Sequence, residues 1–149
     1  MSGEGHATNG RPAGEANGRA TDTVQLTLPV SADLVVLARF AAATIASRAD
    51  FDVEEIEDLR LAVDELCISV TDGSSDGHLE LRFERDGDQI EVVCSFVPGP
   101  GEAERRGRPV PRNELSDRIV DALVDEHGQD SEGGRPRAWL RKRRAPGPR

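Results

Sequence analysis

The sequence predicts an α+β fold, a two-layer sandwich in which about three helices cover one face of a mixed, mostly antiparallel sheet. Several short segments alternate apolar and polar residues with a period of two, which is typical of half-buried strands. Three other segments repeat apolar residues every three or four positions, which is typical of helices packed on a core. The 149 residues suffice for one domain and its tails.

The two ends of the chain differ from its middle. Residues 1–22 are rich in Gly, Ala, Asn, Thr and charge, so we expect a disordered tail. The folded domain is predicted over residues 23–144, and residues 145–149 as a loose tail. Because the start lacks the apolar core of a secretory signal and no apolar run approaches a membrane span, we expect a cytoplasmic protein with no membrane association.

Residues 24–30 predict the first strand, because Val24, Leu26 and Leu28 alternate with polar residues. Pro29 either ends this strand or places it at a sheet edge. A helix is predicted next over 33–48. Ser31 is its expected cap, and its expected inward positions are Leu34, Ala38, Ala41 and Ile45.

The next helix begins with a pattern typical of a capping box, in which Asp52 is followed three residues later by Glu55. Its apolar positions step by three and four residues and predict one continuous core stripe, made of Ile56, Leu59, Val63, Leu66 and Val70. Residues 71–77 are expected to end this helix and turn the chain.

Two alternating segments, 78–85 and 89–97, flank Asp86-Gly87-Asp88 and predict a β-hairpin. Residues 98–112 are too rich in Pro, Gly and charge for a regular element, and a loop of that length is typical of a functional lid or a disordered insert.

The last predicted helix is capped by Asn113 and stops at Gly128. Its expected inward residues are Leu115, Ile119, Ala122 and Leu123. A final strand is predicted over 137–143. Cys67 and Cys94 lie in apolar segments, so we expect small buried thiols in a reducing compartment.

Charge is spread unevenly along the chain. The net formal charge is −9, yet residues 1–22 carry −1 and residues 135–149 carry +7, which leaves −15 on residues 23–134. An acidic body repels phosphate backbones, so we expect no nucleic-acid partner and favour a basic protein. The alternative is that the basic end contacts nucleic acid, with Trp139 as a stacking platform.

The helix over residues 52–71 has a second row of residues beside its core stripe. Glu65 and Ser69 share this row with Leu61 and Ile68, which suggests partial cover by another part of the chain. A partly buried carboxylate at Glu65 could act as a general base. The alternative is that Glu65 points to solvent and the apolar residues pack under a neighbouring element.

Three stretches in order resemble one protein family: LRLAVDELC, IVDALVDE and GGRPRAWLRKR. Over residues 24–143 the chain resembles the anti-sigma factor serine kinases of the RsbW type, most strongly the divergent actinobacterial members. These belong to the histidine-kinase-like ATPase superfamily, so the resemblance implies its Bergerat-type sandwich. It also implies a sigma factor and an anti-anti-sigma STAS-domain protein as partners, and a homodimer formed through the first strand and the alanine-rich helix.

The resemblance assigns Glu65 as the catalytic base and places Ser69 where the family has the asparagine that holds the magnesium of ATP. A serine hydroxyl can ligate Mg²⁺, but its side chain reaches less far. The family's adenine box, Asp-x-Gly-x-Gly, corresponds to residues 97–101, which keep Gly99 and Gly101 but have valine for the aspartate and two added prolines.

The family's third box, Gly-x-Gly-Leu, falls near Glu114 and Ser116, where a carboxylate would face the phosphates. We therefore expect weak or absent ATP binding and no required cofactor. The leading hypothesis is an anti-sigma factor that acts by sequestration. The alternative is an active kinase that phosphorylates its antagonist, with Glu65 as base and Ser69 as metal ligand. In the lid position, four arginines either clamp phosphate or are solvated: Arg105, Arg106, Arg108 and Arg112.

Overall fold

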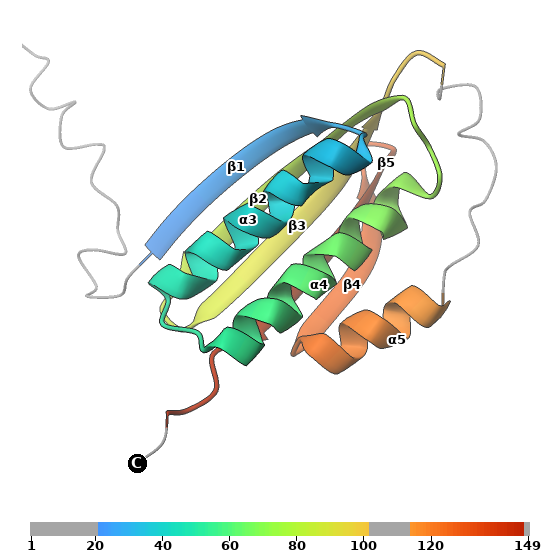
Figure 1. The fold of residues 1–149 in the computed structure, drawn as a ribbon. Coiled ribbons are helices and arrows are strands. Elements are labelled where there is room, and N and C mark those ends of the chain that lie inside the picture. Colours follow the sequence, from blue (N-terminus) through green and yellow to red (C-terminus); the bar gives the residue numbers. More distant parts are fainter. Residues whose placement is uncertain (1–20, 102–113, 148–149) are drawn as a thin grey trace, which may run out of the picture.

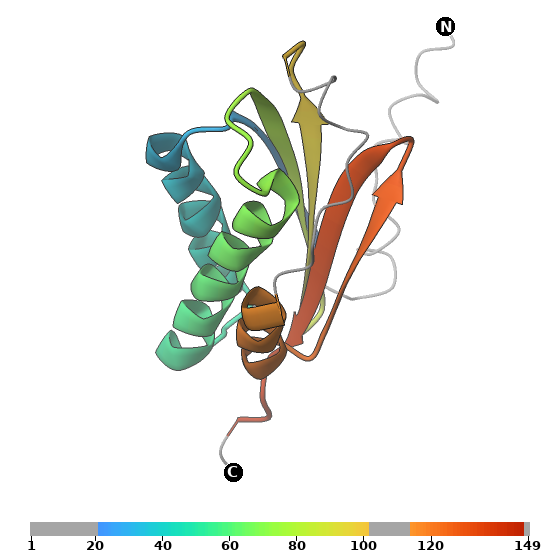
Figure 2. The ribbon, with the colours of Figure 1, turned by 90° about the vertical axis from the view of Figure 1, so that its right-hand side faces the viewer.

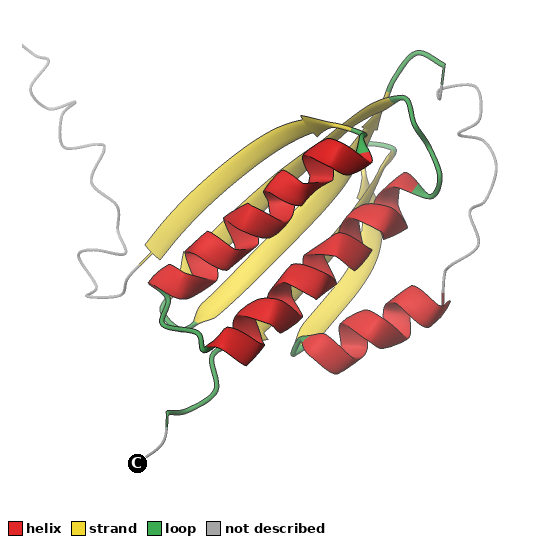
Figure 3. Cartoon of the chain, viewed as in Figure 1, coloured by secondary structure: helices red, strands yellow, loops and turns green. Residues whose placement is uncertain are grey.

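The computed structural model describes residues 21–101 and 114–147. They form a two-layer α+β sandwich, in which an open sheet carries helices on one face (Figure 1, Figure 3). The elements in chain order are β1 (Thr21–Pro29), α3 (Ala32–Arg48), α4 (Val53–Thr71), β2 (Gly77–Asp86), β3 (Gln89–Pro98), α5 (Glu114–Leu123), β4 (Glu126–Glu132) and β5 (Arg135–Arg143).

The sheet has five strands in the order β1-β2-β3-β5-β4, and every neighbouring pair is antiparallel. Figure 2 shows the helices gathered on one side of this sheet, and no helix of residues 21–101 and 114–147 covers its other face. The predicted α+β sandwich is confirmed, with a sheet that is antiparallel throughout rather than mixed. The arrangement is consistent with the histidine-kinase-like ATPase fold that the resemblance implies.

The first strand is longer than predicted. It begins at Thr21, so two residues assigned to the disordered tail belong to the sheet. Residues 1–20 lie outside the described residues. The strand ends at Pro29 and, among the described strands, lies at the sheet edge next to β2. Both expectations for that proline are therefore met.

The β2–β3 hairpin forms where it was predicted. Asp86 pairs with Gln89 across a two-residue turn, and Gly87 adopts a positive φ of 66° at its first position. This conformation is strained for a residue with a side chain, which explains the glycine.

Helix α4 confirms the prediction made from its core stripe and cap. The Asp52 side chain accepts a hydrogen bond of 2.8 Å from the Glu55 amide, and the Glu55 side chain accepts one of 2.9 Å from the Asp52 amide. Leu59 and Val63 are fully buried and Ile56 is partly buried against the core. The core lies between α3 and α4 and the sheet, with large side chains from Phe83, Phe96, Ile45, Leu79, Leu81, Ile90 and Leu140.

Helix α3 packs on the sheet through small residues. Its buried side chains are Ala38, Ala42, Ile45 and Ala46. Leu34, predicted to point inward, is 37% exposed, and Ala41 is only partly buried. Ser31 is the N-cap residue but makes no side-chain capping bond.

The last predicted helix is wrong in length and in its inward face. Helix α5 ends at Leu123, and residues 126–132 form β4, which pairs with β5 through a turn at Gly133-Gly134. Leu115 and Ala122 are exposed, whereas Ser116 and Val120 are buried.

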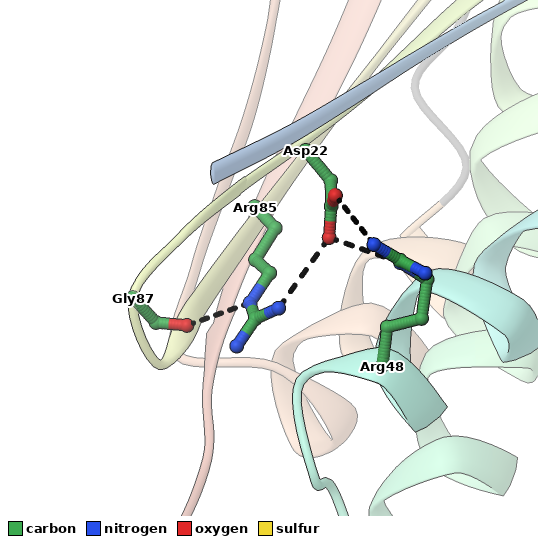
Figure 4. Close-up of polar contacts among 4 residues, drawn as sticks. All are labelled: Asp22, Arg48, Arg85 and Gly87. Carbon is green, nitrogen blue, oxygen red and sulfur yellow. Dashed lines mark hydrogen bonds and ion pairs between the residues drawn. The ribbon is translucent and has the colours of Figure 1, made fainter. Parts of the chain in front are cut away.

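One ion-pair cluster ties the edge strand to the rest of the fold (Figure 4). Asp22 of β1 accepts two hydrogen bonds from Arg48 at the end of α3, at 3.1 and 3.3 Å, and one from Arg85 of β2 at 3.4 Å. Arg85 also donates to the carbonyl of Gly87 at 3.1 Å. The Arg48 hydrogen bond, supported by Arg85 and opposed by partial burial, lowers the pKa of Asp22.

None of the described helices combines the length and the apolar character that crossing a membrane requires.

Candidate functional site

In the second row of α4, Glu65 and Ser69 face α5 and β4, whereas Leu61 and Ile68 are exposed. The hydroxyl of Ser116 on α5 donates to the Glu65 carboxylate at 2.8 Å, and the side-chain amide of Gln129 on β4 donates to the Ser69 hydroxyl. The expected partial cover of Glu65 is therefore real, and it comes from α5 and β4. Glu65 and Ser69 are both partly buried.

The space between Glu65 and its neighbours is almost filled by protein. The cavity beside Glu65 and Ser69 measures about 10 Å³, and its other walls include Ser116, Val120 and Gln129. That volume is close to the minimum for one water molecule. Ligand pockets are typically about 300 to 1,000 Å³. The described residues in this arrangement therefore leave no room at Glu65 for a nucleotide.

Two further contacts hold α5 in place. His127 of β4 lies 3.2 Å from the Asp121 carboxylate of α5. The buried amino group of Lys142 donates to the carbonyl of Leu123, the last residue of α5, at 2.7 Å. The same amino group lies 3.9 Å from Asp58 of α4. A cation at the negative end of a helix is favourable, so Lys142 joins α4 to α5.

Gly99 and Gly101 meet at a different side chain, Asp76. The Gly101 amide donates to the Asp76 carboxylate at 3.0 Å, and the Gly99 amide donates to the Asp76 carbonyl at 3.1 Å. A Cβ on Gly99 would lie 2.4 Å from an Asp76 carboxylate oxygen. Close approach to this carboxylate thus accounts for glycine at position 99 without a nucleotide. No residue of 97–101 lines the cavity at Glu65.

The described residues do not fit a magnesium nucleotide as they stand. Ser69, the candidate metal ligand, has its hydroxyl engaged by Gln129, and Glu65 is engaged by Ser116. Across the described ranges, no three His, Cys, Asp or Glu side chains gather as a metal-binding group. The four arginines predicted for the lid loop lie outside the described residues.

Larger hollows lie on the other face of the sheet. One of about 400 Å³ is lined by residues of β1, β2, β3 and β5 and by Glu132, and one of about 490 Å³ lies around Glu91 and Arg141. Two of their arginines are paired: Arg137 with Asp130 and Glu132, and Arg141 with Glu91 and Glu126. These open, charge-lined hollows include neither Glu65 nor Ser69.

The tryptophan proposed as a stacking platform already has neighbours within the chain. The Arg141 guanidinium lies 4.8 Å from the centre of the Trp139 ring. A Cβ on Gly128 would lie 2.8 Å from the same ring, so the indole covers the backbone of β4 at this glycine.

The two cysteines are free and buried, as predicted. A hydrogen bond with Cys67, together with burial, raises the pKa of the Cys94 thiol. Both thiols belong to the hydrophobic core between α4 and β3.

Sequence reasoning missed two residues of this region, Gln129 and Asp76, and it missed the hydrogen bond between Ser116 and Glu65. Ser116 was placed only by alignment with a phosphate-binding box. One signal was available, because Ser116, Val120 and Leu123 follow helical spacing and place the serine on the buried side.

Sequence comparison finds serine-protein kinases named RsbW among the relatives of this chain. The chain is 31% identical over 76 residues to the serine-protein kinase RsbW of Halalkalibacterium halodurans, covering 50% of this chain and 47% of that protein. It is 36% identical over 78 residues to RsbW of Listeria innocua, half of each chain. It is 22% identical over 120 residues to RsbW of Bacillus cereus, 70% of this chain and 75% of that protein.

The chain thus spans about half the length of the first two of these relatives. No protein-family model matches it.

Proposed function

Since the chain belongs to the RsbW-type family, we propose that it is a cytoplasmic anti-sigma factor that sequesters an alternative RNA polymerase sigma factor. An anti-anti-sigma STAS-domain protein competes for it and releases the sigma factor. The amount of free sigma factor then depends on the relative binding free energies of two complexes, that of the chain with the sigma factor and that of the chain with the STAS-domain protein. Such a switch needs no cofactor.

The hydrogen bond between Ser116 and Glu65 is the observation that favours capture over catalysis. A general base must reach the proton that it removes. Here the Glu65 carboxylate already accepts from a buried side chain, inside a cavity of about 10 Å³. Together with the altered residues at positions 69 and 97, this supports weak or lost ATP binding.

The distribution of charge supports a basic protein as the captured partner. Residues 23–134 carry −15, and α4 alone has six acidic residues against Arg60. Surfaces of opposite charge accelerate association and select between partners more than they raise affinity. Sigma factors read DNA and carry basic surfaces, which suits this body.

We also propose a homodimer through α3 and β1. One row of α3 repeats at spacings of three and four residues and consists of Leu34, Leu37, Ala41, Thr44 and Arg48. Arg48 reaches Asp22, which places this row on the side of α3 toward β1. Leu37 is 42% exposed, and β1 is an edge strand of the sheet that the described residues form. Apolar side chains beside an unpaired strand edge suit pairing with a second copy.

Light scattering tests the dimer. Leu37→Glu places a charge within the row and is expected to give a monomer where the unmodified chain is a dimer. Val53→Glu, also at an exposed apolar position, is the matched control. A dimer that persists in Leu37→Glu contradicts this interface.

Co-elution tests the main proposal. Each sigma factor of the source cell is purified and mixed with the full chain, and one of them is expected to co-elute in a stable complex. Adding the STAS-domain proteins of the same cell, one at a time, should release it with one of them. Failure of every sigma factor to bind contradicts the proposal.

A second candidate function, the serine kinase, is favoured by one observation: Glu65 is retained at the position of the family's base. Incubation of the chain with magnesium, γ-labelled ATP and each STAS-domain protein tests it. Label on a STAS-domain serine that is lost with Glu65→Gln would establish the kinase, and no transfer would exclude it.

A further inference from the structure

We propose that the outward side of α4 is a docking surface for a basic amphipathic helix of a protein partner. This surface, the α4 crest, consists of Glu57, Leu61, Asp64, Ile68 and Asp72. Acidic and apolar residues alternate along it at spacings of three or four, so all five share one side of the helix. The inference deepens the proposed function and rests on it for the identity of the partner.

The apolar residues of the crest, Leu61 and Ile68, do not pack in the hydrophobic core. Leu61 is 50% exposed and Ile68 is 52% exposed, whereas Leu59 and Val63 on the opposite side of the helix are fully buried. A helix that packs one side on a sheet normally presents polar residues to solvent. Two large aliphatic side chains at the centre of an exposed side therefore indicate a contact surface.

The charge of the crest selects a basic occupant. Glu57 pairs with Arg60 of its own helix at 2.7 Å, and Asp64 lies 3.5 Å from Arg39 of α3. Even so, α4 has six acidic residues and one basic residue, and α5 beside it has three and one. On the other face of the sheet, Arg137 and Arg141 are neutralised by local acids. A positively charged partner is therefore drawn to the helix side.

The spacing of the apolar pair favours a helix as the occupant. Leu61 and Ile68 are seven residues apart, which places them two turns and roughly 10 Å apart along the axis. A partner helix that crosses α4 at about 20° meets it with apolar residues at the same repeat. Lysines and arginines beside that apolar row would then face the acidic residues of the crest.

Two probes test the crest with the full chain. The first is each purified sigma factor of the source cell. The second is a synthetic 18-residue helix, about five turns long, with leucines along one side and lysines beside them. The double variant Leu61→Ser with Ile68→Ser is expected to bind either probe at least about tenfold more weakly than the unmodified chain. Phe40→Ser is the matched control, because Phe40 is 55% exposed, like Leu61 and Ile68, but lies on α3 rather than on the crest. It should change affinity less than about twofold.

A charge variant gives an independent readout. Asp72 ends α4 in a left-handed conformation with φ of 46°, which asparagine tolerates well. Asp72→Asn is therefore expected to keep the melting temperature while it reduces the dependence of affinity on salt. If the affinity of Asp72→Asn depends on salt as strongly as that of the unmodified chain, the crest is not the docking surface.

The outcomes separate this inference from the proposed function. If a sigma factor binds the unmodified chain and the double variant equally well, the crest is wrong and the anti-sigma function stands. If no sigma factor binds, the proposed function fails, and the synthetic peptide then tests the crest as a docking surface. A tenfold loss of peptide affinity in the double variant supports the crest. Equal peptide binding by the two chains, or no peptide binding, overturns it. Conversion of a dimer to a monomer by the double variant would overturn it, because the occupant would be a second copy.

Discussion

Ser116 of α5 donates a hydrogen bond of 2.8 Å to Glu65 of α4, and this pair closes the region where the family resemblance places a catalytic base. Ser116 is 5% exposed although it is polar. A buried hydroxyl is stable only when it is hydrogen-bonded. The pair therefore joins α5 to α4 and occupies Glu65 in the same contact.

Removing this hydroxyl should destabilise the protein. Ser116→Ala leaves the partly buried Glu65 carboxylate without its donor, and we expect a loss of about 1 to 3 kcal/mol in the free energy of unfolding. Urea denaturation measures it. The exposed Ser75→Ala is the control and should change the value by less than about 0.5 kcal/mol. Equal stabilities of the two variants would contradict a structural role for the pair.

The Asp22 cluster predicts a pH dependence. Because the folded pKa of Asp22 is lowered, chiefly by the Arg48 hydrogen bond, its contribution to stability is complete above the ordinary aspartate pKa of about 3.9. The contribution is lost as the pH falls through the lowered folded value. Urea denaturation from pH 7 to pH 2 should show Asp22→Asn less stable at neutral pH, with the difference closing below about pH 4. Asp88→Asn, in the β2–β3 turn, is the control. A difference that does not close at low pH contradicts the assignment.

The contact of Gly99 with Asp76 predicts coupling between these two positions. A methyl group on Gly99 would displace the Asp76 carboxylate and break its bond to the Gly101 amide, so Gly99→Ala should cost about 1 kcal/mol. In an Asp76→Ala background the clash is absent and the same substitution should cost little. A double-mutant cycle measures the coupling. Additive costs would show that the glycine is required for another reason.

The Trp139 ring over Gly128 predicts a spectroscopic change. Gly128→Ala places a Cβ 2.8 Å from the ring, so the indole must move and the substitution should cost about 1 to 3 kcal/mol. Trp139 is the single tryptophan in the sequence, so its fluorescence emission reports this movement directly. Gly147→Ala, with open space around it, is the control. Unchanged emission would contradict the contact.

Long, strongly periodic segments were predictable from the sequence. Helix α4 carried both a core stripe and a capping box, and the β2–β3 hairpin combined alternation with an Asp-Gly turn. Strand β4 was missed because Glu126–Glu132 contains no large apolar residue. It forms through pairing with β5 at the Gly133-Gly134 turn, and this pairing ends α5 early.

The candidate site was only half predictable. The position of Glu65 on a partly covered side of α4 followed from helical spacing. Its covering partner did not, because the bond to Ser116 joins residues 51 positions apart and depends on how α5 packs. The contact of Asp76 with Gly101 depends in the same way on the approach of two loops.

Transcription with purified components is the decisive test of sigma-factor sequestration without ATP hydrolysis. RNA polymerase saturated with the cognate sigma factor is titrated with the full chain in two reactions. The first contains ATP and the other three nucleotides. In the second, an analogue with a non-hydrolysable β–γ linkage replaces ATP. Transcripts are expected to fall in proportion to the added chain, and the two titration curves are expected to coincide. No inhibition at excess chain, or inhibition that requires hydrolysable ATP, would contradict sequestration without ATP hydrolysis.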